Sequence, residues 1–193
     1  MIEYIVDIKK FIPDEYNTTI YDIDYNKLYS MGKRLILTDL DNTLISYRED
    51  LPDERLINWK DNLLNMGFEI IICSNNHRQR VERFSNILGL KCVYSAKKPL
   101  LGGLKKAVKK ASRKYLRDEI VEIGDQLMTD QYASKRFGVY TIMVKNIDPK
   151  TEIWTTRFNR RMENKVLKRI LKKHPLLYKE KLERYVSEKI VKD

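Results

Sequence analysis

The feature that most constrains this chain is the stretch from Leu35 to Leu44, where an apolar run ends in two aspartates, Asp39 and Asp41. The run from Leu35 to Thr38 has the composition of a buried strand. Residues two apart in a strand point the same way, so the two carboxylates repel each other unless a cation or a proton lies between them. Parallel α/β sheets bind ligands at the carboxyl ends of their strands. The stretch therefore predicts a site for a divalent metal and a phosphate group.

The rest of the chain alternates apolar runs with amphipathic segments, which predicts an α/β fold with a parallel sheet and right-handed crossovers. We expect a three-layer sandwich around a central sheet of five strands. The predicted strands are 34–38, 68–73, 91–94, 120–123 and 139–144, and the predicted helices between them are 53–66, 78–88, 100–115 and 130–137. We divide the 193 residues into a core at 1–150, whose lead-in to residue 34 has no assigned chemistry, and a C-terminal extension at 151–193.

Polar residues follow three of the later strands. Ser74 and Asn75 follow the second strand, Lys98 follows the third, and Asp125 and Asp130 follow the fourth. The Ser74 hydroxyl can donate to a phosphate oxygen or cap the next helix. Lys98 can balance the aspartates, although a basic pair before a proline is also common in surface loops. Asp125 is placed to bind a metal, and Asp130 either supports the metal or caps a helix.

Three cationic side chains, His77, Arg78 and Arg80, lie at the start of the helix predicted at 78–88. Positive charge at this end of a helix opposes the helix dipole. Arg78 or His77 could reach an anionic group of the substrate, but we favour a structural or solvent-facing role for each.

The motifs also carry a family resemblance. Asp39-Leu40-Asp41-Asn42-Thr43 resembles the D-x-D-x-T signature of the haloacid dehalogenase (HAD) superfamily. Ser74, Lys98 before a proline, and the run from Gly124 to Asp130 resemble its later motifs in the same order. Together they resemble the class IIIA HAD phosphatases, most closely the YqeG family, which is similar to mitochondrial phosphatidylglycerophosphatases. The resemblance implies a HAD-like Rossmannoid fold, and the short intervals after the first two strands leave no room for a cap domain.

These residues suit a Mg²⁺-dependent phosphatase, and the resemblance implies the same roles at the matching positions. Asp39 attacks phosphorus to form an aspartyl-phosphate, while Asp41 protonates the leaving oxygen and then activates water. Oxygen ligands suit Mg²⁺, a hard cation. The predicted metal ligands are Asp39, Asp41 through its backbone carbonyl, Asp125 and Asp130, and the predicted substrate-binding residues are Thr43, Ser74, Asn75 and Lys98.

Charge and hydropathy bear on the partners and the location of the chain. The net charge is +11, and fourteen Lys or Arg residues against six Asp or Glu residues lie from Lys150 onward. This excess favours polyanionic partners, with a solubilising surface as the alternative. No apolar run approaches the roughly 20 residues of a spanning helix, and no secretory signal is evident. We expect a cytoplasmic protein that meets the inner face of an anionic membrane peripherally through residues 150–193.

The C-terminal segment predicts two amphipathic helices separated by Pro175. An apolar residue recurs at every fourth position in the first helix, at Trp154, Phe158, Met162, Val166 and Ile170, and cations occupy the opposite face. The second predicted helix runs over 176–191. Such helices can pack on the sheet or on another subunit, or they can bind an anionic membrane or nucleic acid. The oligomeric state is left open by the sequence.

The predicted absence of a cap leaves the site open, which suits a phosphate on a large molecule such as a lipid, a protein or a nucleic acid. The resemblance points to phosphatidylglycerophosphate. One rival is a receiver-type signalling domain, which would not need the second aspartate, Asp41. Another is an RNA- or ribosome-associated binding protein with an idle or secondary phosphatase site, although the chain lacks an RNA-binding motif.

Overall fold

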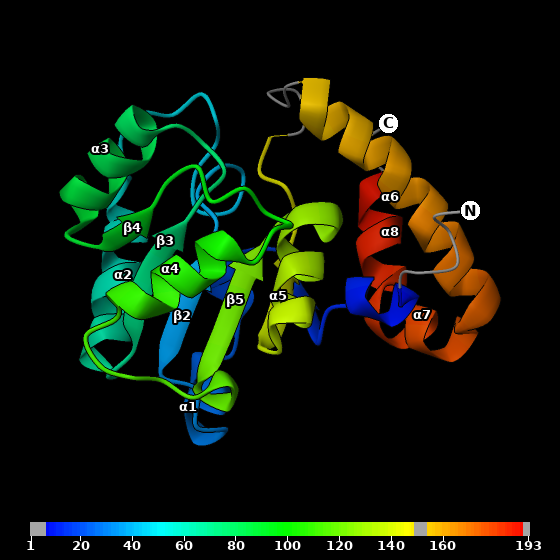
Figure 1. Ribbon diagram of the computed structural model, residues 1–193, viewed down its shortest axis with the longest axis horizontal. Helices are drawn as coiled ribbons and strands as arrows, with labels where there is room; N and C mark the ends of the chain where they lie inside the picture. The colour runs from blue at the N-terminus through cyan, green and yellow to red at the C-terminus, as the bar shows by residue number, and fades with distance from the viewer. Residues whose placement is uncertain (1–6, 149–153, 191–193) are drawn as a thin grey trace.

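A six-stranded sheet with all strands parallel forms the centre of the fold (Figure 1). The computed structural model describes residues 7–148 and 154–190. The strands lie in the order β1-β6-β5-β2-β3-β4. Their bounds are β1 Glu15–Asn17, β2 Leu35–Thr38, β3 Glu69–Cys73, β4 Lys91–Val93, β5 Ile120–Gly124 and β6 Tyr140–Val144. The five predicted strands are confirmed as β2 to β6, and β1 is an addition that the sequence did not predict.

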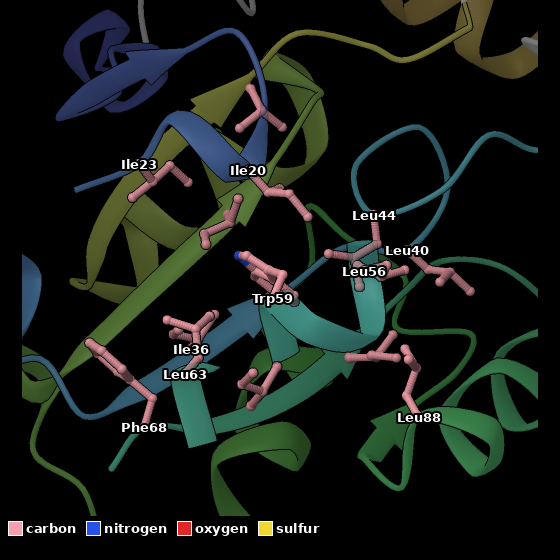
Figure 2. Close-up of a cluster of buried hydrophobic side chains, with 14 of the residues drawn as sticks. Ile20, Ile23, Ile36, Leu40, Leu44, Leu56, Trp59, Leu63, Phe68 and Leu88 are labelled. Atoms are coloured by element: carbon pink, nitrogen blue, oxygen red, sulfur yellow. The ribbon is translucent and has the colours of Figure 1, made fainter. Parts of the chain in front are cut away.

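Helices cover both faces of the sheet and make the predicted three layers. On one face lie α1 (Tyr25–Ser30), α2 (Glu54–Asn65) and α3 (Arg78–Leu88), and on the other lie α4 (Gly102–Lys110) and α5 (Tyr132–Phe137). Figure 2 shows the apolar cluster of the first face, whose labelled residues are Ile20, Ile23, Ile36, Leu40, Leu44, Leu56, Trp59, Leu63, Phe68 and Leu88. The cluster of the second face includes Leu35, Leu37, Ile71, Leu104, Ala107, Ala133 and Phe137.

The connections place the end of β2 at the point where the sheet changes direction. From β2 the chain moves through β3 to β4, and then crosses back to β5 and β6 on the other side of β2. Loops that leave neighbouring strands in opposite directions open a crevice at their carboxyl ends, where open α/β sheets bind ligands. Asp39, the residue after β2, lies at this position.

Strand β1 escapes prediction because it is short and has no strand-like composition. Its three residues, Glu15, Tyr16 and Asn17, are only partly buried. It pairs in parallel with β6, with Tyr16 opposite Met143. The strand thus forms against an edge that the rest of the sheet provides, and its own sequence gives no sign of it.

Helix α4 ends at Lys110, five residues before the predicted end at Tyr115. The carboxylate of Glu69, at the start of β3, explains this early end. It accepts hydrogen bonds from the backbone N–H and the hydroxyl of Ser112, at 2.9 and 2.6 Å, and from the Tyr115 hydroxyl at 3.0 Å. These bonds draw the chain out of the helix, and Ala111 is already extended.

The C-terminal helices pack beside α5, away from α2 and α3 (Figure 1). They are α6 (Trp154–Lys173), α7 (Pro175–Lys181) and α8 (Glu183–Ile190). Leu167 and Ile170 of α6 are buried in a third apolar cluster together with Phe11 near the N-terminus and Met143 of β6. The first predicted alternative, packing against the core, is therefore what the described part of the extension does. The side chains of Trp154 and Phe158, like residues 150–153, lie outside the described residues.

The single helix predicted at 176–191 is wrong, because the segment breaks at Leu182. This residue leaves the helical conformation, with φ −128°, and its side chain is fully buried in the third apolar cluster. The break lets both α7 and α8 turn an apolar side toward the core.

Neither of the intervals that follow β2 and β3 contains an inserted domain. Within the described residues, only α2 lies between β2 and β3, and only α3 lies between β3 and β4. The prediction of a capless core is confirmed. No helix among the described residues has the length and apolar character needed to cross a bilayer.

We predict that Glu188 anchors α8 to the sheet. Its carboxylate accepts hydrogen bonds from Tyr16 at 3.0 Å, Arg184 at 2.9 Å and Lys145 at 3.4 Å. Burial opposes its charge, but these bonds outweigh burial and lower the pKa of Glu188 below its ordinary 4.5. Glu188→Ala should therefore cost about 1–2 kcal/mol in urea unfolding at pH 7, whereas Glu180→Ala, at an exposed position, should cost almost nothing.

The contribution of a carboxylate with a lowered pKa is present above its ordinary pKa and is lost as the pH falls through the lowered value. The difference between Glu188→Ala and the unmodified protein should shrink below about pH 4. A difference that is absent at pH 7, or that grows in acid, would contradict the role assigned to Glu188.

Candidate active site

The predicted nucleophile, Asp39, lies buried at the carboxyl end of β2. Its backbone N–H donates to the carbonyl of Ile123 in β5 at 2.9 Å, which fixes the residue at the sheet edge. Burial raises the pKa of Asp39 to about 7, the Lys98 ammonium works against this rise, and the Asp130 and Asp41 carboxylates add to it. The side chain is therefore sensitive to any further positive charge that reaches the site.

Lys98 forms the central contact of the site. Its Nζ lies 2.9 Å from Asp39 Oδ1 and 2.6 Å from Asp130 Oδ1, and its side chain is only 1% exposed. Burial opposes the ammonium charge, but Asp130 and Asp39 outweigh burial and raise the pKa of Lys98 well above its ordinary value. The predicted choice of Lys98 over Lys97 agrees with this geometry, since Lys97 is exposed.

Asn75 holds the backbone of Lys98 in place. Its Oδ1 accepts from the Lys98 N–H at 2.7 Å, and its Nδ2 donates to the Lys98 carbonyl at 3.0 Å. Sequence reasoning assigned Asn75 to substrate binding, and the structure shows that both ends of its amide contact Lys98.

The third part of the site follows β5. Gly124 ends the strand, Asp125 comes next, and residues Leu127–Gln131 form one turn of π-helix before α5. The predicted α-helix from Asp130 to Phe137 is thus shorter and begins at Tyr132. Such π-turns are frequent at functional sites. Asp130 accepts from the Gln126 N–H at 3.0 Å, so it contacts both this turn and Lys98.

Carboxylate oxygens of Asp39, Asp125 and Asp130 lie within 4.8 Å of one another, and all three residues are buried. The Lys98 ammonium contacts two of these three carboxylates, those of Asp39 and Asp130. Buried like charges at this spacing need a cation or protons. The residues present therefore fit a divalent ion with a preference for oxygen ligands, such as Mg²⁺.

Two further predicted residues, Thr43 and Ser74, are also found at the carboxyl end of the sheet. The Thr43 hydroxyl donates to Asp125 Oδ1 at 3.3 Å, so Thr43 orients a candidate metal ligand. Ser74 is buried after β3, and its oxygen accepts from the Asn76 N–H at 3.1 Å. The bond leaves the Ser74 hydroxyl hydrogen to donate to another group. His77, and not Ser74, caps α3.

Asp41 contacts a different set of residues. Its Oδ1 accepts from Arg80 Nε at 2.6 Å and its Oδ2 from Asn76 Nδ2 at 2.8 Å. The sequence places Arg80 near the start of α3 but assigns it no role, and it names only Arg78 and His77 as cations that could reach a substrate. Arg78 is exposed and pairs with Glu82, which agrees with the favoured solvent-facing role. No motif marked Arg80, because only the course of α3 decides which cation turns inward.

Glu122 is a further buried carboxyl near the cluster. It lies in the middle of β5 and is 1% exposed. Burial raises the pKa of Glu122 well above its ordinary value, and the nearby Asp130 carboxylate raises it further. Its position inside an apolar strand was visible in the sequence and could have signalled a special environment.

The sequence of this chain is similar to that of a bacterial protein. The Bacillus subtilis (strain 168) protein called "Probable phosphatase YqeG" is 36% identical over 172 residues, which are 89% of this chain and 98% of the relative. The chain belongs to the YqeG family.

Solved structures show weaker likenesses. The cobalt-bound deoxy-D-mannose-octulosonate 8-phosphate phosphatase from Haemophilus influenzae is 14% identical, with 74% of this chain and 90% of that chain covered and a TM-score of 0.46. The 3-deoxy-D-manno-octulosonate 8-phosphate phosphatase from Moraxella catarrhalis is 18% identical, with coverage of 61% and 81% and a TM-score of 0.40. No protein-family model matches the chain. The assignment to the YqeG family rests on the B. subtilis relative.

In this YqeG-family protein, we predict that removing the ammonium of Lys98 strongly destabilises the metal-free fold. Lys98→Met leaves the buried carboxylates of Asp39 and Asp130 facing each other, and breaking a buried pair costs about 3–5 kcal/mol. Urea unfolding at pH 8 in chelator measures the loss. The matched variant Lys97→Met changes an exposed lysine in the same loop and should unfold like the unmodified protein. Equal stabilities for the two variants would refute the central place of Lys98.

We also predict that Gly124 is needed because the backbone of β5 approaches Asp130 closely. A Cβ at Gly124 would lie 2.5 Å from the Cβ of Asp130, so the aspartate must move. Gly124→Ala should cost about 1–3 kcal/mol through overpacking and should weaken Mg²⁺ binding in calorimetric titration. Gly102→Ala, which meets no atom within 4 Å, should leave both unchanged. Unaltered Mg²⁺ binding in Gly124→Ala would show that Asp130 is not a ligand.

Proposed function

We propose that this chain is a Mg²⁺-dependent phosphatase that transfers the phosphoryl group of a monoester to Asp39 and then to water. The observation that carries the proposal is the buried contact of Lys98 with Asp39 and Asp130, beside Asp125 and at the switch point of the sheet. An ammonium and three carboxylates, brought together at a ligand-binding edge, suit a site that takes up a metal ion and a phosphate group.

Asp39, Asp125 and Asp130 would hold the ion, together with the backbone carbonyl of Asp41. When bound, Mg²⁺ supplies positive charge that orients the phosphate and offsets its negative oxygens. The side chain of Asp41 accepts hydrogen bonds from Arg80 and Asn76 and is not part of the three-carboxylate cluster, so we assign it the acid–base role.

The protein groups then divide the reaction into two steps. A carboxylate oxygen of Asp39 forms a bond to phosphorus as the ester P–O bond breaks, and Asp41 gives its proton to the leaving oxygen. Asp41, now ionised, takes a proton from water as the water oxygen attacks phosphorus and releases Asp39. Ser74 and Lys98 donate to the non-bridging phosphate oxygens in both steps.

The open edge of the sheet favours a large substrate, since the described part of the chain has no cap domain after β2 or β3. We propose phosphatidylglycerophosphate, presented at an anionic membrane, which is the substrate that the family resemblance suggests. Leu167 and Ile170 on the apolar side of α6 are buried, whereas Lys165, Lys168 and Lys172 are exposed. Contact with the membrane would therefore be electrostatic and would not require insertion of α6. No observation on the described residues favours the alternative of an RNA-binding protein.

Replacing the nucleophile tests the reaction. Asp39→Asn should lower Mg²⁺-dependent release of phosphate from p-nitrophenyl phosphate by at least about 10³-fold, because an amide cannot form the acyl phosphate. Asp61→Asn, at an exposed position on α2, is the matched control and should keep full activity. Turnover by Asp39→Asn at the rate of the control would refute the assignment. A parallel screen of lipid, nucleotide, sugar and phosphopeptide substrates ranks the substrate classes.

Charge reversal tests the membrane contact without exposing the apolar face of α6. The triple change Lys165→Glu, Lys168→Glu and Lys172→Glu should reduce sedimentation with vesicles that contain phosphatidylglycerol by about tenfold or more, since each basic residue near such a surface contributes about 1 kcal/mol. The same change of charge on α4, at Lys105, Lys106 and Lys109, controls for net charge. Equal effects of the two triple variants, or no effect of either, would exclude a specific contact through α6.

A further inference from the structure

Two side chains at the start of α3 hold the carboxylate of Asp41. Arg80 Nε donates to its Oδ1 at 2.6 Å, and Asn76 Nδ2 donates to its Oδ2 at 2.8 Å. The side chains of Arg80 and Asp41 are only 10% and 14% exposed. A charge-assisted hydrogen bond of this length, shielded from water, fixes a carboxylate more firmly than a surface ion pair does.

Arg80 also contacts the loop that follows the aspartates. Its Nη2 donates to the carbonyl of Ser46 at 3.1 Å, its Nη1 lies 3.6 Å from Asp50 Oδ1, and its guanidinium lies 4.9 Å from the centroid of the Tyr47 ring. The planar guanidinium is therefore restrained on several sides. It has little freedom to swing away from Asp41.

The first turn of α3 sets the direction of this side chain. The Nδ1 atom of His77 accepts from the Arg80 N–H at 3.3 Å and so caps the helix. A cation in the first turn opposes the helix dipole, and the Asp41 carboxylate offsets that cost. Arg78, two positions earlier, has a different environment, with a side chain that is 70% exposed and pairs with Glu82 at 2.8 Å.

We propose that Arg80, together with Asn76, is a positioning residue that sets the angle at which Asp41 delivers its proton to the leaving oxygen. The inference rests on the proposed function and deepens it. Each carboxylate oxygen has two lone-pair directions, so one hydrogen bond to each leaves room for the transferred proton. As the ester P–O bond breaks, its electron pair goes to the leaving oxygen, and the proton of Asp41 moves to that same oxygen.

The role predicts a dependence on the leaving group that a merely structural contact would not show. Because kcat/KM covers the steps up to P–O cleavage, it reports on protonation of the leaving oxygen. Nitrophenolate leaves readily without a proton, whereas an alkoxide does not. General acid catalysis contributes about 10² to 10⁴-fold where the leaving group needs the proton.

The experiment compares p-nitrophenyl phosphate with an alkyl ester, glycerol phosphate, in the full-length protein with Mg²⁺. Arg80→Ala should lower kcat/KM about 100-fold for the alkyl ester and less than about tenfold for the aryl ester. Arg80→Lys should fall between, and Asn76→Ala should show the same selectivity to a smaller degree. Arg78→Ala is the control on the same helix, and it should behave like the unmodified protein with both substrates.

A second measurement keeps the inference testable if Arg80→Ala folds poorly. In the Asp41→Asn background, Arg80→Lys should cost little further, because a residue that acts through Asp41 has nothing left to position. Equal losses on the two esters, or full additivity with Asp41→Asn, would overturn the role of Arg80 and leave the proposed function intact. If the unmodified protein hydrolyses no phosphate ester in the presence of Mg²⁺, the proposed function fails, and this inference fails with it.

Discussion

The buried contact of Lys98 with Asp39 and Asp130 is the interaction on which the site depends. It joins three segments that are distant in the sequence: the end of β2, the loop after β4 and the π-turn after β5. Asn75 fixes the backbone of this loop, and Gly124 lets Asp130 approach. Burying these charges costs free energy. The arrangement is therefore better explained by what it binds than by a gain in stability.

The sequence predicted the strands and the main site residues, because apolar runs and the polar residues that follow them can both be recognised locally. Continuous apolar runs marked β2 to β6, and the polar residues after them had to meet at one edge once the sheet was parallel. Asp39, Lys98, Asp125 and Asp130 could thus be grouped before their distances were known. The family resemblance assigned the roles, and the short intervals between strands excluded a cap.

What the sequence did not predict depends on tertiary contacts. Strand β1 forms only against β6, Glu69 ends α4 by binding Ser112, and burial of Leu182 breaks the last helix. Within the site, too, tertiary contacts decided what the sequence could not predict. Arg78 and Arg80 have the same chemistry and similar positions, and only the packing of α3 against the loop after β2 turns Arg80 to Asp41. Helical periodicity predicts on which face of a helix a residue lies, but it does not predict which residue that side chain contacts.

The central claim is that Asp39 accepts the phosphoryl group, and trapping the covalent intermediate tests it most directly. Turnover is quenched in acid, the protein is reduced with borohydride, and its peptides are sequenced by mass spectrometry. An acyl phosphate at Asp39 is reduced to homoserine, so the account predicts homoserine at this position only when both Mg²⁺ and a phosphate ester were present. Turnover that leaves Asp39 unmodified, or a label at another carboxylate, would contradict it.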